Sequence, residues 1–455
     1  MSAYDDFLAS KQIVVHPDGI DVPREAISEA LYPFQREIVR WACRKGRAAI
    51  FCDTGLGKSR QQLEWARQMG QRTLFVAPLA VAQQTVREAA ILGMDLIYAR
   101  SMEDAGRYTI TNYEMVDRFD ASQFGAVVLD ESSVLKHYEN KTRTALIAQF
   151  GATPFRLCCT ATPAPNDIAE LANHAEFLGV MSRPEMLAAF FVHDQDGWRL
   201  KGHARQPYFR WLASWAISMK RPSDLGFAND GYDLPPLEIV PEIVRSDYVP
   251  AGQLFATALK GVSDRAQVRK RTVADRVQRA VDLVAGEPGE PWLLWCGTND
   301  ESTALTAAIP GAVEVTGSQS PDEKANALTR FAAGEIRVLV TKPSIAGFGM
   351  NFQHCARMAF VGLSDSYEQY YQAIRRCYRY GQDRPVRAHI ILTDLEEPIY
   401  ANVIRKEAEA QAMATDLVRA VASFERAELA NENRRLDYLA TQPMRLPTWL
   451  DSEAA

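Results

Sequence analysis

The chain has no run of apolar residues long enough to cross a lipid bilayer, because such a run needs about 20 consecutive apolar residues. Its first residues, 1–6, are acidic and lack the basic and apolar regions of a secretory signal peptide. These two absences predict a cytoplasmic protein that has no membrane partner.

Cysteines are also few, seven in 455 residues, and none of them forms a CxxC pair. Cys52, Cys158, Cys159 and Cys296 lie in or beside short apolar runs that are typical of strands. This placement predicts reduced cysteines in the core rather than a zinc site or a disulfide framework. Low-complexity tracts and short-period repeats are likewise absent.

The chain has no excess of basic residues: its net charge is −6 and its isoelectric point is near 5.8. Dedicated nucleic-acid binders often have a basic balance, so the average charge gives no support for such a role. It does not exclude a local basic groove. The apolar and charged fractions, 47% and 24%, are those of an ordinary globular protein, and the length suggests two or three domains.

Short apolar runs alternate along the chain with segments of helical pattern. In the first half we expect strands at 48–52, 73–77, 126–129 and 156–159, and helices at 60–69, 81–92 and 142–150. In the second half we expect strands at 292–296, 338–340, 358–361 and 389–392, and helices at 301–309, 321–333 and 367–378. Nearly continuous apolar strands that alternate with helices predict parallel sheets covered on both faces. The sequence therefore predicts an α/β protein with two lobes.

The domain boundaries are predicted from turn-rich stretches, of which 230–236 is the clearest. We expect an N-terminal extension at 1–30, a first lobe at 31–235, a second lobe at 236–395 and a C-terminal tail at 396–455. The tail has a long charged helical pattern to about residue 440, which predicts a solvated helix packed on the second lobe.

An insert at about 181–230 fits neither predicted sheet cleanly. It interleaves aromatic with basic residues, among them Phe209, Trp211, Trp215 and Lys220. Two interpretations stay open: a structural brace under the second lobe, which we favour, or a surface that stacks on or grips nucleic acid.

Residues 52–59 read Cys-Asp-Thr-Gly-Leu-Gly-Lys-Ser and connect a predicted strand to a predicted helix. A glycine-rich turn before a helix N-terminus directs backbone N–H groups and the helix dipole at one point, where an anion can bind. Lys58 can reach the β- and γ-phosphates of a nucleotide, and the Ser59 hydroxyl can hold Mg²⁺. Cys52 stands where the general pattern has its first glycine, so this motif alone leaves an ordinary strand–helix turn open.

An apolar strand in the first lobe ends in two adjacent acids, Asp130 and Glu131. The chain turns at the end of the strand, so both carboxylates can face one site. We expect Asp130 to complete the Mg²⁺ shell and Glu131 to orient and deprotonate the attacking water. Such an acid pair is more often a helix cap or a loop, but the phosphate loop upstream favours the functional interpretation.

Arg376 and Arg379 in the second lobe are three residues apart and would share one face of the predicted helix. Arginines in this pattern usually form a solvated basic face. The functional interpretation is a pair that reaches across a cleft to the γ-phosphate, where an arginine finger contributes roughly 10³–10⁵ in rate.

The ordered set of motifs resembles the superfamily-two DNA translocases of the Swi/Snf type, and in particular the compact DEAD/DEAH-box-like helicases found in bacteriophages and prophages. The resemblance covers about residues 31–397. In the first lobe it rests on residues 31–35, 53–59, 76–79, 111–114, 130–133 and 160–163. In the second lobe it rests on 316–318, 346–352 and the specific pattern of Gln372, Arg376, Arg379, Gly381 and Gln382. Ser132 and Ser133 depart from the usual second motif, so no DEAD or DEAH subclass follows.

The resemblance implies two tandem RecA-like lobes with an ATP cleft between them, and ATP and Mg²⁺ as cofactors. It implies that Lys58, Asp130, Glu131, Arg376 and Arg379 are catalytic and that Ser59 and Asp130 hold the metal. The implied nucleotide-binding residues are Gln35 at the adenine, Thr54, Gly55, Leu56, Gly57, Lys58, Ser59, Gly349 and Asn351. Thr160, Thr162 and Gln372 would couple the ATP site to the track. The implied nucleic-acid contacts, mostly to phosphates, are Pro78, Leu79, Thr111, Asn112, Ser344 and Gly347.

The resulting prediction is a monomeric ATP-dependent motor that moves on DNA, duplex rather than single-stranded. A phage-encoded chain would work in the cytoplasm of the bacterial host, with a phage or host replication or recombination protein as candidate partner. Two alternatives stay open: an RNA helicase, and a nucleotide-gated scaffold that recruits a replication or nuclease partner. Gly381 and Gln382 favour a DNA translocase over an RNA helicase, and the retained catalytic residues speak against a scaffold.

Overall fold

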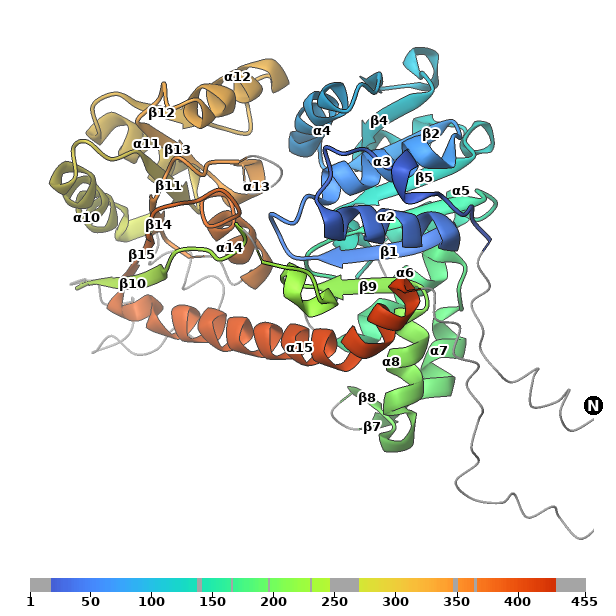
Figure 1. Ribbon diagram of the computed structural model, residues 1–455. Coiled ribbons are helices and arrows are strands. Elements are labelled where there is room, and N and C mark those ends of the chain that lie inside the picture. Colours follow the sequence, from blue (N-terminus) through green and yellow to red (C-terminus); the bar gives the residue numbers. More distant parts are fainter. Residues whose placement is uncertain are drawn as a thin grey trace, which may run out of the picture.

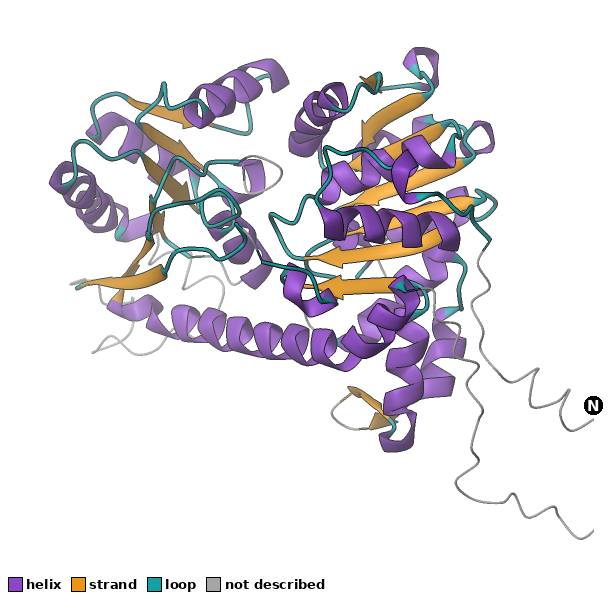
Figure 2. Ribbon diagram, in the orientation of Figure 1, coloured by secondary structure: helices purple, strands orange, loops and turns teal. Residues whose placement is uncertain are grey.

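The structure is a computed structural model that describes residues 18–136, 141–164, 167–194, 197–229, 231–245, 270–346, 351–363 and 366–430. Two parallel β-sheets form the centres of two lobes, and helices cover both faces of each sheet (Figure 1; Figure 2). The strand orders are β3-β4-β2-β5-β6-β1-β9 in lobe 1 and β10-β15-β14-β11-β13-β12 in lobe 2. The predicted α/β class with two parallel sheets is confirmed.

Lobe 1 comprises the elements around the seven-stranded sheet. Its strands are β1 (Arg47–Cys52), β2 (Thr73–Ala77), β3 (Leu96–Tyr98), β4 (Tyr108–Asn112), β5 (Ala126–Asp130), β6 (Phe155–Cys159) and β9 (Ala216–Met219). Its helices are α2 (Pro33–Lys45), α3 (Lys58–Met69), α4 (Leu79–Ile91), α5 (Lys141–Phe150), α6 (Leu171–Leu178), α7 (Arg183–Phe190) and α8 (Arg205–Ala213). A small antiparallel pair, β7 (Phe191–Asp194) and β8 (Gly197–Leu200), projects beside α8.

Lobe 2 comprises the elements around the six-stranded sheet. Its strands are β10 (Leu237–Val244), β11 (Trp292–Cys296), β12 (Ala312–Val315), β13 (Val338–Thr341), β14 (Arg357–Val361) and β15 (Val386–Thr393). Its helices are α10 (Val273–Gly286), α11 (Asn299–Ala308), α12 (Pro321–Ala332), α13 (Pro343–Ala346) and α14 (Tyr367–Ile374), and α15 (Glu397–Leu429) follows.

Alternate residues of the central strands enter two different cores. In β1, Ala49 and Phe51 belong to the core that includes α5 to α8, whereas Ala48 and Ile50 belong to the core that includes α2 to α4. Successive side chains of a strand point to opposite faces, so a strand covered on both faces must be apolar throughout. This requirement explains the continuous apolar runs. All seven cysteines are free and buried, as predicted, and four of them lie in the strands β1, β6 and β11.

The insert predicted to fit neither sheet supplies the edge strand β9 to lobe 1. β9 pairs in parallel with β1, with Ala49 opposite Ala216. Phe209, Trp211 and Trp215 are buried in the lobe 1 core. A brace under lobe 2 is therefore wrong, and these rings cannot stack on a nucleic acid. The strand escaped prediction because it has four residues and includes a serine. The strands β3, β4, β10 and β12 were missed as well.

The helix predicted to reach residue 378 ends at Ile374. Beyond it, Arg376 N–H bonds to the Ala373 carbonyl and Cys377 N–H to the Ile374 carbonyl, so the chain tightens into turns. Gly381 follows with a φ of 88°, which ends any helical path. Arg376 and Arg379 therefore do not share a helical face, and both project from turns.

The helix α15 connects the two lobes instead of packing on lobe 2 alone. It begins after β15 and passes beneath both lobes, and its 33 residues are about 50 Å long (Figure 1). Leu417 and Val421 enter a lobe 1 core, and the Glu425 carboxylate accepts a 2.6 Å hydrogen bond from the Ser218 N–H of β9. The prediction of a solvated helix on lobe 2 is wrong for this C-terminal half, and residues 431–455 lie outside the described part of the chain.

The described part of the N-terminal extension packs on lobe 1, since Val22 and Ile27 are buried in its core. Across the described ranges, no helix combines the length and apolar character that a bilayer-spanning segment needs.

Candidate nucleotide and nucleic-acid site

The phosphate loop occupies the turn between β1 and α3. Gly55 and Gly57 have φ values of 88° and 75°, a region that glycine adopts without strain. A Cβ at position 57 would lie 2.2 Å from Nε2 of Gln35, and one at position 55 would lie 3.2 Å from the Cβ of Tyr380 in lobe 2. A side chain at either position would therefore crowd a neighbouring residue, which is Gln35 of lobe 1 for Gly57 and Tyr380 of lobe 2 for Gly55.

Gln35 is buried beneath the phosphate loop. Its Nε2 donates to the Leu56 carbonyl at 3.0 Å, and its Oε1 accepts the Tyr32 N–H at 2.9 Å. Gln61 also donates to the Leu56 carbonyl, at 2.9 Å. Gln35 thus shapes the phosphate loop, in addition to the adenine contact expected from the resemblance.

Lys58 is the first residue of α3, and Ser59 lies in the first turn beside it. The Lys58 ammonium donates to the Cys52 carbonyl at 2.9 Å and to the Asp53 carbonyl at 3.3 Å. An ammonium has three N–H donors, so these two carbonyls leave one donor for a phosphate oxygen. Thr54 and Leu56, two further expected nucleotide contacts, lie in the same loop, between the end of β1 and the start of α3.

The acid pair lies at the end of β5. Oδ1 of Asp130 accepts hydrogen bonds from Gln62 Nε2 at 2.7 Å and from the Glu131 N–H at 3.0 Å. Glu131 has a φ of 51°, and within the described ranges it is the one residue other than glycine with a positive φ. A residue held in this region costs about 1–3 kcal/mol, and such strain clusters at functional sites. The backbone geometry therefore supports a functional role for Glu131.

Burial raises the pKa of both Asp130 and Glu131 above the ordinary range, although the charges of Lys58 and Arg376 oppose that shift. Oε2 of Glu131 has no hydrogen-bond partner among the described residues. Two acids in a low-dielectric site are stabilised in their charged form by a bound cation. The pair therefore suits a divalent metal, for which Asp130 and Ser59, in the first turn of α3, are the expected ligands.

The arginine pair of lobe 2 is held by other polar residues of that lobe. Arg376 is buried and donates to the Gln372 carbonyl at 3.1 Å and to Gln372 Oε1 at 3.0 Å. Arg379 donates through Nη1 to Oδ1 of Asn351. Gln372, expected to couple ATP to the track, thus directly orients one arginine, and Asn351, expected near the nucleotide, orients the other.

The arginines carry positive charge into a buried cleft. Burial lowers the pKa of Arg379 to about 9, and the charge of Arg376 contributes to that shift. Burial also lowers the pKa of Arg376, while Glu131 and Asp130 across the cleft oppose the shift. Buried charges are costly without a partner of opposite sign. A cleft that favours a cation at the acids and an anion at the arginines suits a metal–nucleotide complex.

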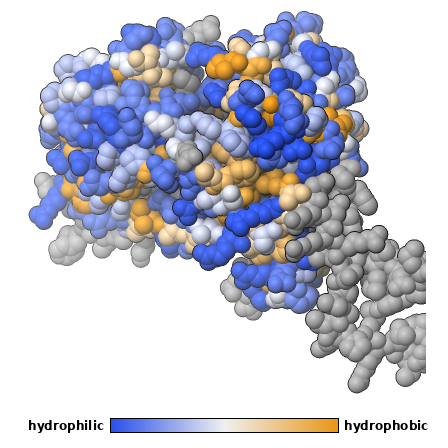
Figure 3. Space-filling model, viewed as in Figure 1, coloured by the Kyte–Doolittle hydropathy of each residue, from blue (hydrophilic) through white to orange (hydrophobic). Residues whose placement is uncertain are grey.

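A cavity of about 530 Å³, which we name the interlobe cavity, is lined by residues of α4 in lobe 1 and of α12 in lobe 2. Pro78, Leu79 and Ser344, three of the expected nucleic-acid contacts, line it. Glu131 also reaches its wall, so the cavity adjoins the acid pair. Most of the surface of both lobes is hydrophilic on the face shown in Figure 3, with smaller apolar areas between.

The other expected nucleic-acid residues lie elsewhere. Thr111 and Asn112 are buried in β4, and the two residues that follow them, Tyr113 and Glu114, line the interlobe cavity in their place. Gly347 and Gly349 lie outside the described residues.

The expected coupling threonines follow β6. Thr160 is buried; its N–H donates to the Ile50 carbonyl at 3.3 Å and its Oγ1 accepts the Thr162 N–H at 3.1 Å. Thr162 lines a second cavity of about 260 Å³, together with Asp53 of the phosphate loop and Tyr371 of lobe 2. The threonines therefore connect the strand beside the phosphate loop to the contact between the lobes.

Three supporting residues were not predicted. Gln62 binds Asp130, and its position four residues after Lys58 on α3 would have indicated that it faces the same site. Tyr113 donates its hydroxyl to the Asp130 carbonyl at 2.7 Å. His174 lies 3.1 Å from the Ser132 hydroxyl, and burial lowers its pKa to about 4, so it is neutral at pH 7. Nothing in the sequence indicated these last two contacts.

The comparison with protein families identifies part of lobe 2. Residues 275–381 match the helicase conserved C-terminal domain, and the matched region includes Arg376 and Arg379. The match indicates a helicase-like protein of superfamily 1 or 2, and the matched domain is RecA-like. Proteins with this domain are in general nucleic-acid-dependent ATPases that use ATP and Mg²⁺. A search of curated proteins found no match to the chain.

Proposed function

We propose that the chain is an ATP-dependent motor of the Swi/Snf type, which couples ATP hydrolysis to movement on duplex DNA. The observation that carries the proposal is the position of Arg376, which is buried in lobe 2, is held by Gln372, and lies close enough to the acid pair of lobe 1 for their charges to interact. Groups that suit a γ-phosphate, an attacking water and a metal thereby come from two lobes to one place.

In the proposed reaction, Lys58 and the N–H groups of residues 54–59 bind the phosphates. Ser59 and Asp130 would hold Mg²⁺, which would supply positive charge to offset that of the phosphates. Glu131 orients the attacking water and accepts its proton. Arg376 and Arg379 stabilise the negative charge that spreads over the transferring phosphoryl group.

The proposed movement of the lobes depends on the arginines, which lie in lobe 2 whereas the phosphate loop lies in lobe 1. Loss of the γ-phosphate removes the anion that offsets two buried guanidinium groups, which weakens the closed arrangement of the lobes. The interlobe cavity has walls from both lobes, so its width changes as they separate. A nucleic acid held there would be gripped and released once in each cycle.

The first test is steady-state ATP hydrolysis without nucleic acid and then with duplex DNA, single-stranded DNA and single-stranded RNA, at low and moderate salt. Strong stimulation by duplex DNA is the expected result. Stimulation by RNA alone would replace the proposal with an RNA helicase. Tight ATP binding without hydrolysis would favour a nucleotide-gated scaffold that recruits a replication or nuclease partner.

Arg87 offers a test of the proposed track. It is exposed and lines the interlobe cavity from α4, and it donates a 3.3 Å hydrogen bond to the half-buried Thr329 hydroxyl of lobe 2. If it contacts a phosphate, Arg87→Ala should lower the slope of log K against log salt by about 1, equally for unrelated DNA sequences. Arg199→Ala on the exposed strand β8 is the matched control. An unchanged slope for Arg87→Ala would place the nucleic acid outside this cavity.

A further inference from the structure

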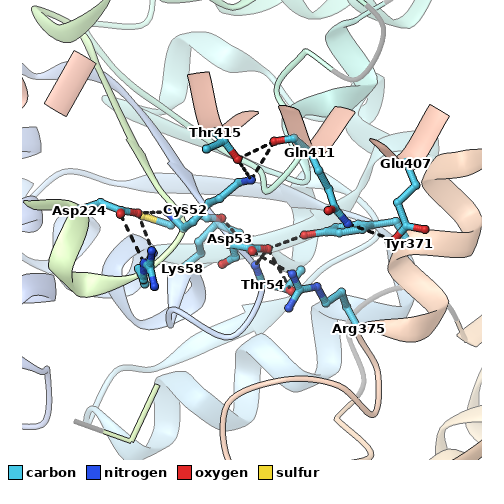
Figure 4. A network of polar contacts seen from close by, with 12 residues as sticks. Cys52, Asp53, Thr54, Lys58, Asp224, Tyr371, Arg375, Glu407, Gln411 and Thr415 are labelled. Atoms are coloured by element: carbon cyan, nitrogen blue, oxygen red, sulfur yellow. Dashed lines mark hydrogen bonds and ion pairs between the residues drawn. The ribbon is translucent and has the colours of Figure 1, made fainter. Parts of the chain in front are cut away.

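Among the polar contacts between the lobes, one lies beside the phosphate loop and involves none of the residues to which a role is given above. The Tyr371 hydroxyl donates to Oδ1 of Asp53 at 2.5 Å, and Arg375 Nη2 donates to Oδ2 at 3.0 Å (Figure 4). Asp53 belongs to lobe 1, whereas Tyr371 and Arg375 belong to lobe 2. Both oxygens of one carboxylate are thus engaged from the opposite lobe.

The contact is largely shielded from solvent, and Arg375 makes further contacts within lobe 2. The Asp53 side chain is 15% exposed and that of Arg375 is 18% exposed. The Arg375 guanidinium also lies over the rings of Tyr371 and Tyr378, at 5.1 Å and 5.4 Å from their centroids. Burial opposes ionisation of Asp53, but Arg375, the Tyr371 hydroxyl and the Thr54 N–H lower its pKa below the ordinary value. The carboxylate is therefore charged at neutral pH.

Asp53 is also part of the phosphate loop. Its Oδ1 accepts the Thr54 N–H at 2.6 Å, and its carbonyl lies 3.3 Å from the Lys58 ammonium. Its own N–H donates to the Met219 carbonyl of β9 at 2.9 Å. A displacement of the Asp53 carboxylate would therefore be transmitted to the loop that binds the phosphates.

Arg375 immediately precedes Arg376 in the chain. The hydrogen bond that Arg375 donates to Asp53 of lobe 1 fixes the start of the turn from which Arg376 and Arg379 project. A negative charge at the start of an anion site also repels a polyanion unless a positive charge offsets it. Arg375 supplies that charge, and it does so from lobe 2.

We propose that Asp53, Tyr371 and Arg375 form an interlobe latch. The latch holds the turn of Arg376 and Arg379 over the phosphate loop, and it neutralises the Asp53 carboxylate where ATP binds. The identity of the ligand as ATP rests on the proposed function, whereas the contact between the lobes does not. Asp53, Tyr371 and Arg375 are thus positioning residues that act through the phosphate loop and the arginine pair.

The role of Arg375 in neutralising Asp53 is tested by removing the arginine first and then also the negative charge of Asp53. Arg375→Ala should weaken binding of a fluorescent ATP analogue about 10-fold, because it leaves a shielded carboxylate without its partner. Adding Asp53→Asn to Arg375→Ala should return the affinity to within about 3-fold of the wild type, since neighbouring groups in one network are not additive. Turnover should stay low in the double variant, because the turn of Arg376 and Arg379 still lacks the Arg375 bond to lobe 1. An affinity that does not recover would contradict the proposed role of Arg375 in neutralising Asp53.

The positional component is tested by the distance between the lobes, without nucleotide. All seven native cysteines are buried, so dyes can be attached at Glu103→Cys in lobe 1 and Glu335→Cys in lobe 2, both exposed sites. Arg375→Ala and the milder Tyr371→Phe should lower energy transfer between the dyes or broaden its distribution. Arg405→Ala, which breaks an exposed ion pair with Glu409 on α15, is the control.

The two readouts separate failure of the latch from failure of the proposed function. Energy transfer identical to wild type in both Tyr371→Phe and Arg375→Ala would overturn the latch, even if ATP hydrolysis is stimulated by DNA. A shift in energy transfer would support the latch, even if no nucleic acid stimulates hydrolysis. Tyr371→Phe removes one hydroxyl only, so it remains informative if Arg375→Ala fails to fold.

Discussion

Replacing Glu131 by glutamine is expected to lower the rate of ATP hydrolysis about 10²–10⁴-fold, the usual contribution of a positioned general base. ATP affinity should change little, because Lys58 and the loop N–H groups that would bind the phosphates are untouched. The amide cannot accept the proton of the attacking water, so ATP stays intact and keeps the arginines engaged. Single-turnover hydrolysis and binding of a fluorescent ATP analogue measure the two quantities separately.

The glutamine variant should also remain longer on nucleic acid in the presence of ATP than the wild-type protein does. Glu103→Gln, at an exposed position remote from the cleft, is the matched control. Hydrolysis at the native rate in Glu131→Gln would show that another group activates the water. A collapse of ATP affinity would instead assign Glu131 to nucleotide binding.

The candidate site was predictable because its parts lie at corresponding places in the sheet. Cys52 ends β1, Asp130 ends β5, and Thr160 follows β6. The carboxyl ends of parallel strands meet at one edge of a sheet, where ligands bind in open α/β folds. A motif that follows each apolar run therefore reaches a common site, although the runs are far apart in the chain.

Contacts that depend on how the lobes meet were not predictable. Asp53 and Tyr371 are separated by 318 positions, and neither belongs to a local pattern that indicates a pair. The course of α15 over lobe 1 depends on a buried glutamate, Glu425, which binds a strand that was itself missed. The positive φ of Glu131 could not be predicted from the sequence. Positive φ values are usually predicted from glycine, and position 131 has a glutamate.

The position of the arginines shows a limit of periodicity. Residues 367–374 have a helical pattern that continues without interruption into Arg376 and Arg379. The helix nevertheless ends at Ile374, and Gln372 and Asn351 then hold the two side chains from different elements. The prediction that both arginines are directed at the cleft does not require a helix. The prediction that they share one helical face does require it, and that prediction is wrong.

Removal of the Arg379 guanidinium should have the largest effect on turnover. An arginine that stabilises the transferring phosphoryl group contributes roughly 10³–10⁵ in rate, so Arg379→Ala should lower kcat by at least about 10³-fold. ATP affinity should fall much less, because the charge that Arg379 stabilises develops only in the transition state. Steady-state kcat and the dissociation constant of an ATP analogue give the comparison.

Two variants sharpen this prediction. Arg379→Lys keeps the positive charge but loses the planar donor set, which can bind Asn351 and still present further N–H groups to a phosphate, so it should recover only a small part of the rate. Arg384→Ala, which breaks a partly exposed pair with Glu290 in the same lobe, should leave kcat near the native value. Equal losses of kcat and ATP affinity in Arg379→Ala would make Arg379 a ground-state binding residue. Arg376, whose charge interacts with those of the acid pair, would then be the one remaining candidate of the two for stabilising the transition state.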